Sequence, residues 1–258
     1  MAGSVDLAHN GAIATVTLSN PDKLNALTTT MWRELGSVFS GLSESNDTRC
    51  VIIRGAGEAF AAGADISVFE TERRDAASAK VYANTTVSAL HALSHCRHPV
   101  VAQIKGACVG GGLEIASACD MRIAAASSKF GIPVKKLGLV VGQSELKDLL
   151  RVVSPAVALE IVLEGRIFGA AEAERKGLVN RIVADEELEK EVRDTAERIA
   201  EGAPLVARWH KRLISRLLNP APLTETESDE FFACFDTEDF RTGYAAFLAK
   251  KKPVFAGR

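Results

Sequence analysis

The sequence has few of the features that mark nucleic-acid-binding or membrane proteins. Its 258 residues carry 31 Lys and Arg against 33 Asp and Glu, and no basic stripe is interleaved with aromatic residues. A net charge of −2 argues against broad binding to the nucleic-acid backbone. No stretch approaches the ~20 apolar residues of a membrane span, and the N-terminus lacks a basic region followed by an apolar one. We therefore expect a cytoplasmic protein that binds neither nucleic acid nor membrane.

Patterns typical of disulfides and metal sites are also scarce. The five cysteines include no Cys-x-x-Cys pair, so we interpret them as reduced residues, mostly of the core: Cys50, Cys96, Cys108, Cys119 and Cys234. His91, His95 and His98 follow i, i+4, i+7 spacing, which could place three imidazoles on one side for a metal. No Asp or Glu accompanies them, however, and histidines near a helix C-terminus also complement its dipole. We expect no metal.

The most informative stretch is residues 101–120, VAQIKGACVGGGLEIASACD. Residues 100–104 suit a buried strand, and the triplet Gly110-Gly111-Gly112 lets the backbone turn sharply or approach a ligand closely. A helix that begins at about Gly111 has unpartnered N–H groups at its start, which favour negative charge. Glu114 lies about one turn in, and its side chain leans back toward those amides. A base beside an oxyanion site indicates enolate chemistry.

This stretch and its neighbours also allow other interpretations. Glu114 could merely cap the helix, and the glycine triplet could mark only a tight turn. A dinucleotide-binding G-x-G-x-x-G does not fit because position 113 is Leu, and no Walker Gly-Lys-Ser/Thr follows. A hydrolase G-x-S-x-G fails because position 146 is Leu. Ser144 instead predicts the N-cap of a helix over 145–152.

Elsewhere the chain alternates between strand and helix patterns. Asn10-Gly11 between residues 5–9 and 13–18 predicts a hairpin. Further strands are expected at 50–54, 121–124 and 178–183, helices at 28–42, 78–96, 155–164 and 170–176, a turn at 127–131 and an irregular loop at 133–141. Residues 59–66, AFAAGADI, form a second loop of small residues that exposes its backbone after a strand. From residue 185 onward the patterns are helical.

Four separated segments carry a family resemblance. They are Asn20-Pro21 through Asn25-Ala26-Leu27, then AFAAGADI, then GGGLE followed by CDMRIA, and the tail GYAAFLAKKKPVF. The chain resembles the enoyl-CoA hydratase/isomerase (crotonase) superfamily over nearly its whole length. The resemblance implies an α/β fold: a spiral of ββα units over residues 1–195 that holds the active site, and a helical C-terminal oligomerisation segment over 196–258. It also implies a homotrimer, or a homohexamer built from two trimers.

The resemblance further implies an acyl-CoA substrate whose thioester carbonyl accepts hydrogen bonds from the backbone N–H groups of Ala64 and Gly111, with Glu114 as the acid–base group. The residues expected to contact the rest of the substrate are Ala62, Asp65, Ile66, Gly110, Val134, Phe247 and Lys250. The last two would approach the nucleotide, from a neighbouring subunit if a trimer forms. Lys250 to Lys252 could equally be a solvated terminal charge run. No cofactor is expected beyond the coenzyme A of the substrate.

One position departs from the family pattern. Members that hydrate enoyl-CoA carry a second glutamate after the proline of an FGxPE-like segment, and here that segment ends in Val134. Either Glu114 moves both protons in turn, or Glu145, in an adjoining loop, supplies the missing group. We expect an enoyl-CoA hydratase first; the alternatives are an enoyl-CoA isomerase, an acyl-CoA decarboxylase, and a homolog that binds acyl-CoA without turnover.

Overall fold

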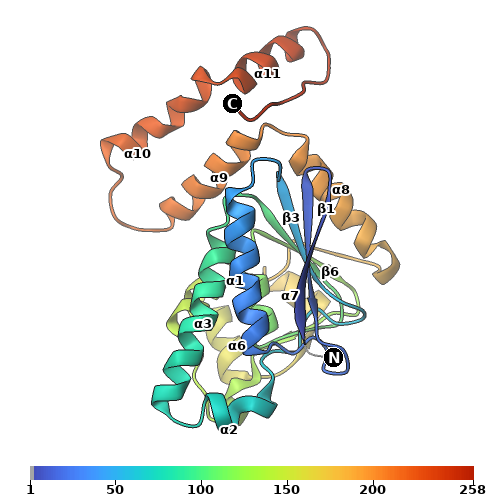
Figure 1. Cartoon of the computed structure of the whole chain (residues 1–258), viewed down its shortest axis with the longest axis vertical. Coiled ribbons are helices and arrows are strands. Elements are labelled where there is room, and N and C mark those ends of the chain that lie inside the picture. The colour runs from blue at the N-terminus through green and yellow to red at the C-terminus, as the bar shows by residue number, and fades with distance from the viewer. Residues whose placement is uncertain (1–2) are drawn as a thin grey trace.

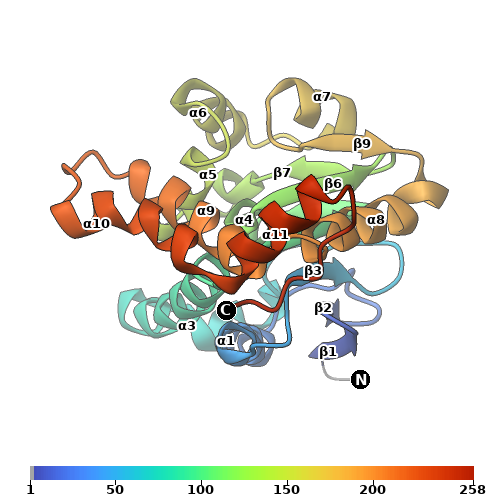
Figure 2. The same ribbon diagram turned by 90° about the horizontal axis from the view of Figure 1, so that it is seen from above.

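The computed structural model describes residues 3–258 and contains two sheets (Figures 1 and 2). The larger sheet has the order β1-β2-β3-β4-β6-β9, in which β1 is antiparallel to β2 and every other neighbouring pair is parallel. Its strands are β1 (Ser4–Asn10), β2 (Ile13–Ser19), β3 (Cys50–Gly55), β4 (Val100–Ile104), β6 (Met121–Ala125) and β9 (Arg181–Val183). The smaller sheet consists of β5 (Ala107–Val109), β7 (Lys129–Gly131) and β8 (Phe168–Gly169).

Both faces of the large sheet are covered by helices. On one side, α1 (Thr29–Glu44) packs against α3 (Ala76–Ser94), and on the other α8 (Leu188–Ala200) contacts β3, β4 and β6 (Figure 2). The first four residues of β3 are all apolar and buried, and their packing shows why. Val51 and Ile53 join the main core, whereas Cys50 and Ile52 join a second core with α8. A strand buried on both faces needs apolar residues at successive positions, not at alternate ones.

The remaining helices complete the core and the C-terminal region. They are η1 (Ile66–Val68), α2 (Phe69–Glu72), α4 (Gly111–Ala118), η2 (Pro133–Leu137), α5 (Gln143–Leu150), α6 (Pro155–Glu164), α7 (Ala170–Arg175), η3 (Asp185–Glu187), α9 (Pro204–Leu217), α10 (Glu225–Asp229), η4 (Glu230–Asp236) and α11 (Glu238–Leu248). Figure 1 shows α10 and α11 extending beyond the core at one end of the molecule. The boundary expected after residue 195 falls within α8. No helix within residues 3–258 combines the length and apolar character that crossing a bilayer requires.

Several expectations from the sequence are confirmed. The hairpin forms around Asn10-Gly11, with Asn10 opposite Ile13. Helix α1 is capped by Thr28, whose side chain accepts a hydrogen bond from the amide of Met31, and α4 begins at Gly111. Together with the alternation of strands and helices, these features give the expected mixed α/β fold with a helical C-terminal region.

Four local expectations were wrong. Ser144 is not an N-cap, because α5 already begins at Gln143 and the carbonyl of Gly142 accepts the amide of Leu146 at 3.0 Å. The irregular loop expected over 133–141 begins with the 3₁₀ helix η2. The strand expected over 178–183 is limited to β9, because the amide of Leu178 still donates to Ala173 of α7 at 2.9 Å. The turn expected over 127–131 contains β7, which pairs with the distant β5.

Candidate active site

Two loops that are far apart in the sequence are joined by backbone hydrogen bonds. Ala61 pairs with Cys108 in a parallel bridge: the Ala61 amide donates to the Ala107 carbonyl at 2.8 Å, and the Val109 amide donates to the Ala61 carbonyl at 3.0 Å. The segment that contains AFAAGADI therefore runs alongside the strand that leads into the glycine triplet. Residues 64 and 111, which the sequence singled out separately, lie on neighbouring backbones.

The amides of Ala64 and Gly111 border one small space. Leu27 bonds to the residues on either side of Ala64, donating to the Gly63 carbonyl at 2.7 Å and accepting the Asp65 amide at 2.9 Å. The Ala64 N–H is thereby left facing away from Leu27. Among the hydrogen bonds of residues 3–258, neither this N–H nor that of Gly111 is donated to a protein acceptor. A Cβ placed on Gly111 would lie 3.7 Å from the Ala64 nitrogen, so the two amides are close.

Glycine is required at two positions beside these amides. Gly110 has φ 51° and ψ −120°, a backbone conformation that L side chains rarely adopt. Its amide donates to the Gly131 carbonyl at 2.9 Å, which fixes the turn. A Cβ on Gly112 would lie 2.2 Å from the Ala61 carbonyl oxygen, closer than any packing allows. The start of α4 is therefore held against the 61–65 loop with no room for side chains.

Glu114 stands in the first turn of α4, one turn beyond the free Gly111 amide. Its own amide donates to the Gly110 carbonyl at 2.9 Å. Burial first, and then the negative charge of Glu145, raise the pKa of Glu114 to about 7 against the opposing effect of the Arg73 guanidinium. Near neutral pH the carboxyl group is therefore divided between its protonated and ionised forms, so it can either give or accept a proton.

A cationic and aromatic cluster that the sequence did not reveal lies on the same side as Glu114. The Arg73 guanidinium is 4.7 Å from the ring centre of Phe69 and 4.6 Å from that of Tyr82. The Trp32 indole donates to the Tyr82 hydroxyl at 3.2 Å. Burial raises the pKa of Tyr82, and the charge of Glu114 contributes in the same direction. Nothing in the local pattern ERRD around Arg73 distinguishes it from an ordinary surface arginine.

Val134, where the family pattern has a second glutamate, and Glu145, which could replace that glutamate, lie on separate elements. Val134 is in η2 and packs partly buried against the main core. Glu145 is in the first turn of α5, and α5 packs against α4, which carries Glu114. The Oε2 atom of Glu145 is buried without a hydrogen-bond partner. Of the two, only Glu145 presents a group that can move a proton.

Of the three loop residues expected to contact the substrate, two have groups that are already engaged and the third is exposed. The Ala62 amide donates to the Leu24 carbonyl at 3.0 Å, and the Asp65 carboxylate lies 2.7 Å from the Lys23 ammonium. That hydrogen bond from Lys23 lowers the pKa of Asp65. Ile66 is 62% exposed. The amides of Ala62 and Asp65 are therefore not free to bind a substrate along this loop.

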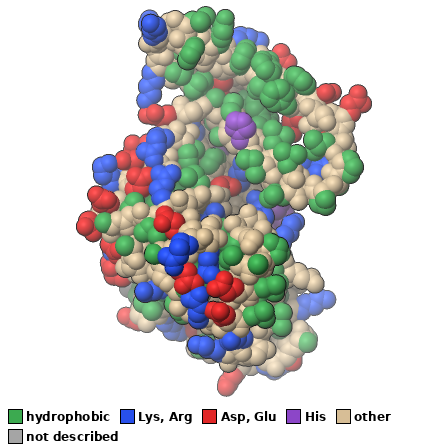
Figure 3. Space-filling view, turned by 180° about the vertical axis from the view of Figure 1, so that it is seen from behind, with side chains coloured by type: hydrophobic (Ala, Val, Ile, Leu, Met, Phe, Trp, Pro, Cys, Tyr) green, Lys and Arg blue, Asp and Glu red, His purple; other side chains and the backbone are tan. Residues whose placement is uncertain are grey.

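Phe247 and Lys250 are not brought to Glu114 within one chain. They lie at the end of α11 and just beyond it, at the opposite end of the molecule from α2, which closely follows Ile66 (Figure 1). Phe247 is 81% exposed, and Lys250 has a left-handed backbone with φ 53°. Figure 3 shows apolar side chains gathered over this C-terminal end. Any contact between these residues and a substrate in the site would have to come from another copy of the chain.

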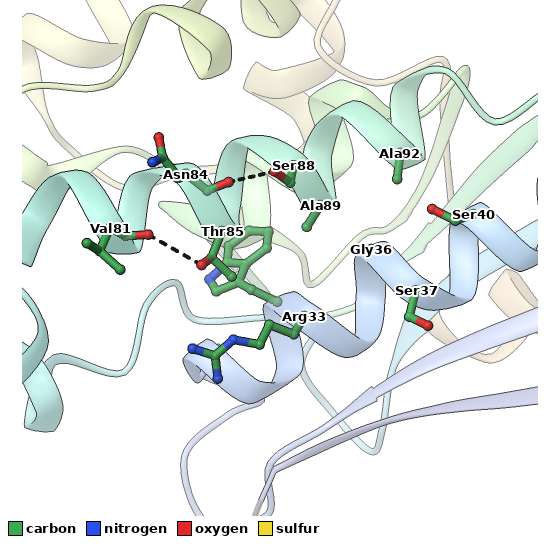
Figure 4. Close-up of a pocket in the computed structure, with 11 residues that line it drawn as sticks. Arg33, Gly36, Ser37, Ser40, Val81, Asn84, Thr85, Ser88, Ala89 and Ala92 are labelled. Atoms are coloured by element: carbon green, nitrogen blue, oxygen red, sulfur yellow. Dashed lines mark hydrogen bonds between the residues drawn. The ribbon is translucent and has the colours of Figure 1, made fainter.

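A cleft of about 540 Å³ opens between α1 and α3, separate from the free amides (Figure 4). It is lined by Trp32, Arg33, Gly36, Ser37, Ser40, Val81, Asn84, Thr85, Ser88, Ala89 and Ala92. No carboxylate or imidazole is among these residues, so the cleft offers no general base. Trp32 connects the two regions, because its Cζ2 atom lies 3.3 Å from the position that a Cβ on Gly111 would take.

The three histidines at helical spacing do not converge. His91 and His95 stack with their ring centres 3.9 Å apart, while His98 is buried and its Nε2 lies 2.9 Å from the Leu42 carbonyl. Burial lowers the pKa of His98 to about 4. Within residues 3–258, no three His, Cys, Asp or Glu side chains are grouped so as to hold a metal ion.

Comparison with known proteins identifies the family. The sequence model for enoyl-CoA hydratase/isomerase matches residues 8–258. The chain belongs to the enoyl-CoA hydratase/isomerase family. It is 37% identical over 249 residues to a probable enoyl-CoA hydratase of Mycobacterium bovis, covering 95% of each chain. It is 33% identical over 252 residues to a short-chain-enoyl-CoA hydratase of Clostridium acetobutylicum, covering 96% of each.

Solved structures of this family share the fold. A crystal structure described as an enoyl-CoA hydratase/carnithine racemase from Magnetospirillum magneticum superimposes with a TM-score of 0.97 at 50% sequence identity. The match covers 98% of this chain and 96% of the other. The expected crotonase-like fold is therefore confirmed over nearly the whole length.

Proposed function

We propose that this protein is an enoyl-CoA hydratase, which adds water reversibly to a 2-enoyl-CoA to give a 3-hydroxyacyl-CoA. The observation that carries the proposal is the pair of free amides at Ala64 and Gly111, with Glu114 one helical turn away and its pKa raised to about 7. The hydratase names of relatives that match this chain over 95% or more of its length support the same reaction.

In the proposed reaction the two amides hold the thioester oxygen. As the oxygen of water bonds to C3, the electrons of the C2=C3 double bond move toward C1 and leave an enolate oxygen. Donors fixed in position strengthen as that charge develops, and each contributes roughly 3 to 4 kcal/mol to the transition state. Glu114 delivers its proton to C2, and the proton that the water loses on bonding to C3 passes to a carboxylate of the site, so that H and OH are both added across the double bond. No cofactor is required beyond the coenzyme A of the substrate.

We propose further that the protein works as a homotrimer or as a homohexamer of paired trimers. Support comes from the aromatic side chains that the C-terminal helices leave exposed, because a soluble monomer rarely keeps such a patch. These are Phe231, Phe232, Phe235, Phe240, Tyr244 and Phe247. A second copy would also be the source of any contact from Phe247 and Lys250. The proposed cytoplasmic location is supported by five free cysteines.

Hydration of crotonyl-CoA, followed as loss of enoyl absorbance, tests the function. Wild-type protein should hydrate crotonyl-CoA. Glu114→Gln should reduce kcat by roughly 10²–10⁴-fold, because the side-chain amide of glutamine cannot transfer a proton. Glu197→Gln, an exposed change on α8, is the matched control and should behave as wild type. No loss of absorbance although acyl-CoA binds would instead favour a non-catalytic homolog.

The same protein preparation tests the other reactions. An isomerase would convert a 3-enoyl to a 2-enoyl thioester with one base, and a decarboxylase would release CO₂ from a 2-carboxyacyl-CoA with the amides alone. Either reaction at a higher kcat/KM than hydration would replace the hydratase proposal. Insensitivity of that reaction to Glu114→Gln would distinguish decarboxylation from isomerisation.

A further inference from the structure

We propose that Glu145 is the second catalytic carboxylate: it accepts the proton from the attacking water, while Glu114 gives a proton to C2. This inference rests on the proposed hydratase function and adds a residue to its mechanism. The atoms balance, because the water oxygen bonds to C3, one water proton passes to Glu145, and C2 receives the proton of Glu114. Glu145 then loses its proton to solvent and Glu114 takes one up, which restores the starting protonation of both carboxyl groups.

The chemistry calls for two groups that act at different atoms. A water molecule becomes a competent nucleophile when a base accepts its proton, and the negative charge of the enolate is neutralised when an acid protonates C2. One carboxyl group can perform both tasks only if it reaches the water and C2 in the same complex. Val134 can perform neither. A second carboxylate next to Glu114 removes this constraint.

The packing of the helices brings Glu145 to the required side. Helices α4 and α5 pack against each other, and Glu114 and Glu145 each stand in the first turn of their helix. A glutamate at this position would ordinarily cap its own helix by accepting amide hydrogen bonds. In the part of the chain that the structure describes, the Glu145 Oε2 is buried and accepts none. A buried carboxylate oxygen without a donor is costly, so its position calls for a partner such as a bound water molecule.

Gly142 makes room for this carboxylate. A Cβ at position 142 would lie 2.4 Å from the Glu145 Oε2 and 3.1 Å from its Cδ. The backbone of Gly142 does not itself need glycine, because φ −67° and ψ 160° suit any residue. A side chain at 142 would therefore displace the Glu145 carboxylate from this position. Gly142→Ala offers a steric test that leaves both acids in the sequence.

The charges around Glu114 agree with a neighbouring carboxylate. The charged groups that influence it are Glu145 from α5 and Arg73 from the segment after α2, and Glu114 in turn influences Tyr82 from α3. After burial, the negative charge of Glu145 is the largest cause that raises the pKa of Glu114. The charge of Glu145 thus favours the protonated form of Glu114, which is the form that the proposed acid needs.

Two reactions separate the role of Glu145 from the function as a whole. The first is hydration of crotonyl-CoA; the second is exchange of the C2 hydrogens of butyryl-CoA with D₂O, which needs the amides and Glu114 but no attack by water. Glu145→Gln should lower kcat for hydration by roughly 10²–10⁴-fold with KM within about threefold, and leave exchange within about threefold of wild type. Gly142→Ala should lower hydration in the same direction by a smaller factor, and Glu197→Gln should change neither reaction.

Each alternative outcome has a distinct meaning. Wild-type hydration that Glu145→Gln leaves unchanged overturns the role of Glu145 and preserves the proposed function. Exchange without hydration by the wild type contradicts both the hydratase reaction and the role of Glu145. If the wild type catalyses neither reaction, the proposal that the two amides and Glu114 stabilise an enolate is wrong. Equal loss of both reactions in Glu145→Gln would mean that Glu145 supports the site in general and does not activate water.

A titration provides a readout that does not depend on turnover. In protein labelled with ¹³C at the glutamate carboxyl groups, the Glu114 signal is identified by its absence in Glu114→Gln. Its pKa should fall from about 7 toward the ordinary range in Glu145→Gln, because the neighbouring negative charge is gone, and should not move in Glu197→Gln. An unchanged pKa in Glu145→Gln would place the two carboxylates too far apart to share a water molecule.

Discussion

The two sides of the candidate site are built in different ways. The amide side, residues 63–65 and 110–112, consists of backbone groups held by hydrogen bonds between loops and by Gly110 and Gly112, whose positions do not accommodate a side chain. The carboxylate side, Glu114 and Glu145, consists of side chains at the starts of two packed helices. Only the amide side is fixed by the main chain, so under the proposed function the pair of free amides can be retained while the acid–base groups change position.

This difference explains how Val134 can stand where the family pattern has a glutamate. Removing a backbone donor would require a change of the fold, because the Ala64 amide is oriented by the bonds of Leu27 to residues 63 and 65. A carboxylate needs only a helix or loop that reaches the same space, and α5 offers one. Under the proposed function, the amide side supplies the enolate stabilisation that the candidate reactions share, and the carboxylate side supplies the proton carriers that distinguish them.

The strongest test of the amide side compares Gly111→Pro with Gly111→Ala. Both add a Cβ, which would lie 3.1 Å from Leu27 Cδ1, but only proline removes the N–H. Proline is well tolerated at the first position of a helix, so the change is aimed at the donor. Hydration by Gly111→Pro should be roughly 10²–10³-fold slower than by Gly111→Ala. Equal kcat values for the two folded variants would show that this amide does not polarise the thioester.

On the carboxylate side, the next largest effect is on stability. Because the pKa of Glu114 is raised from 4.5 to about 7, the folded protein binds a proton between these pH values that the unfolded chain has released. The free energy of unfolding therefore falls as the pH rises from about 4.5 to 7 and changes no further above that through this group. Glu114→Gln should remove this loss and stabilise the protein at pH 8 by about 2 to 3 kcal/mol relative to its effect at pH 4.

Denaturant unfolding at pH 4 and pH 8, at one protein concentration, measures this difference. Glu197→Gln is the control, because its exposed carboxylate should give the same change at both pH values. A Glu114→Gln effect that does not depend on pH would mean that the carboxyl group is not desolvated in the folded protein. The expected gain in stability, set against the expected loss of turnover, would show that the charge is kept for chemistry and not for folding.

The two sides also differ in how far the sequence predicts them. Gly110 to Gly112 and Glu114 lie within one short stretch, and the helix start and the direction of the glutamate follow from local rules. The meeting of Ala64 with Gly111 depends on the bridge between Ala61 and Cys108, 47 positions apart by residue number, which no local pattern encodes. The sequence pointed to that meeting only through the family resemblance.

The surroundings of Glu114 were harder to predict for the same physical reason. Arg73 comes from the segment after α2, Tyr82 from α3 and Glu145 from α5, and each lies near Glu114 only after the helices pack. The helix start at Gln143 and the strand β7 were missed because a glycine N-cap and a long-range pairing leave little trace in composition. Electrostatic tuning of the site is therefore a property of the fold more than of any motif.

The smallest expected effect comes from the charge of Arg73, which tests the electrostatic tuning of Glu114. Arg73→Met keeps an unbranched side chain between Phe69 and Tyr82 but removes the positive charge that opposes the other influences on Glu114. The pKa of Glu114 should therefore rise above about 7, and the alkaline limb of the pH profile for hydration should shift upward by less than about one pH unit. Arg74→Met, at the next position and paired with Asp75, should leave the limb in place. A downward shift in Arg73→Met would contradict the electrostatic role, because removing a nearby cation can only favour the protonated acid.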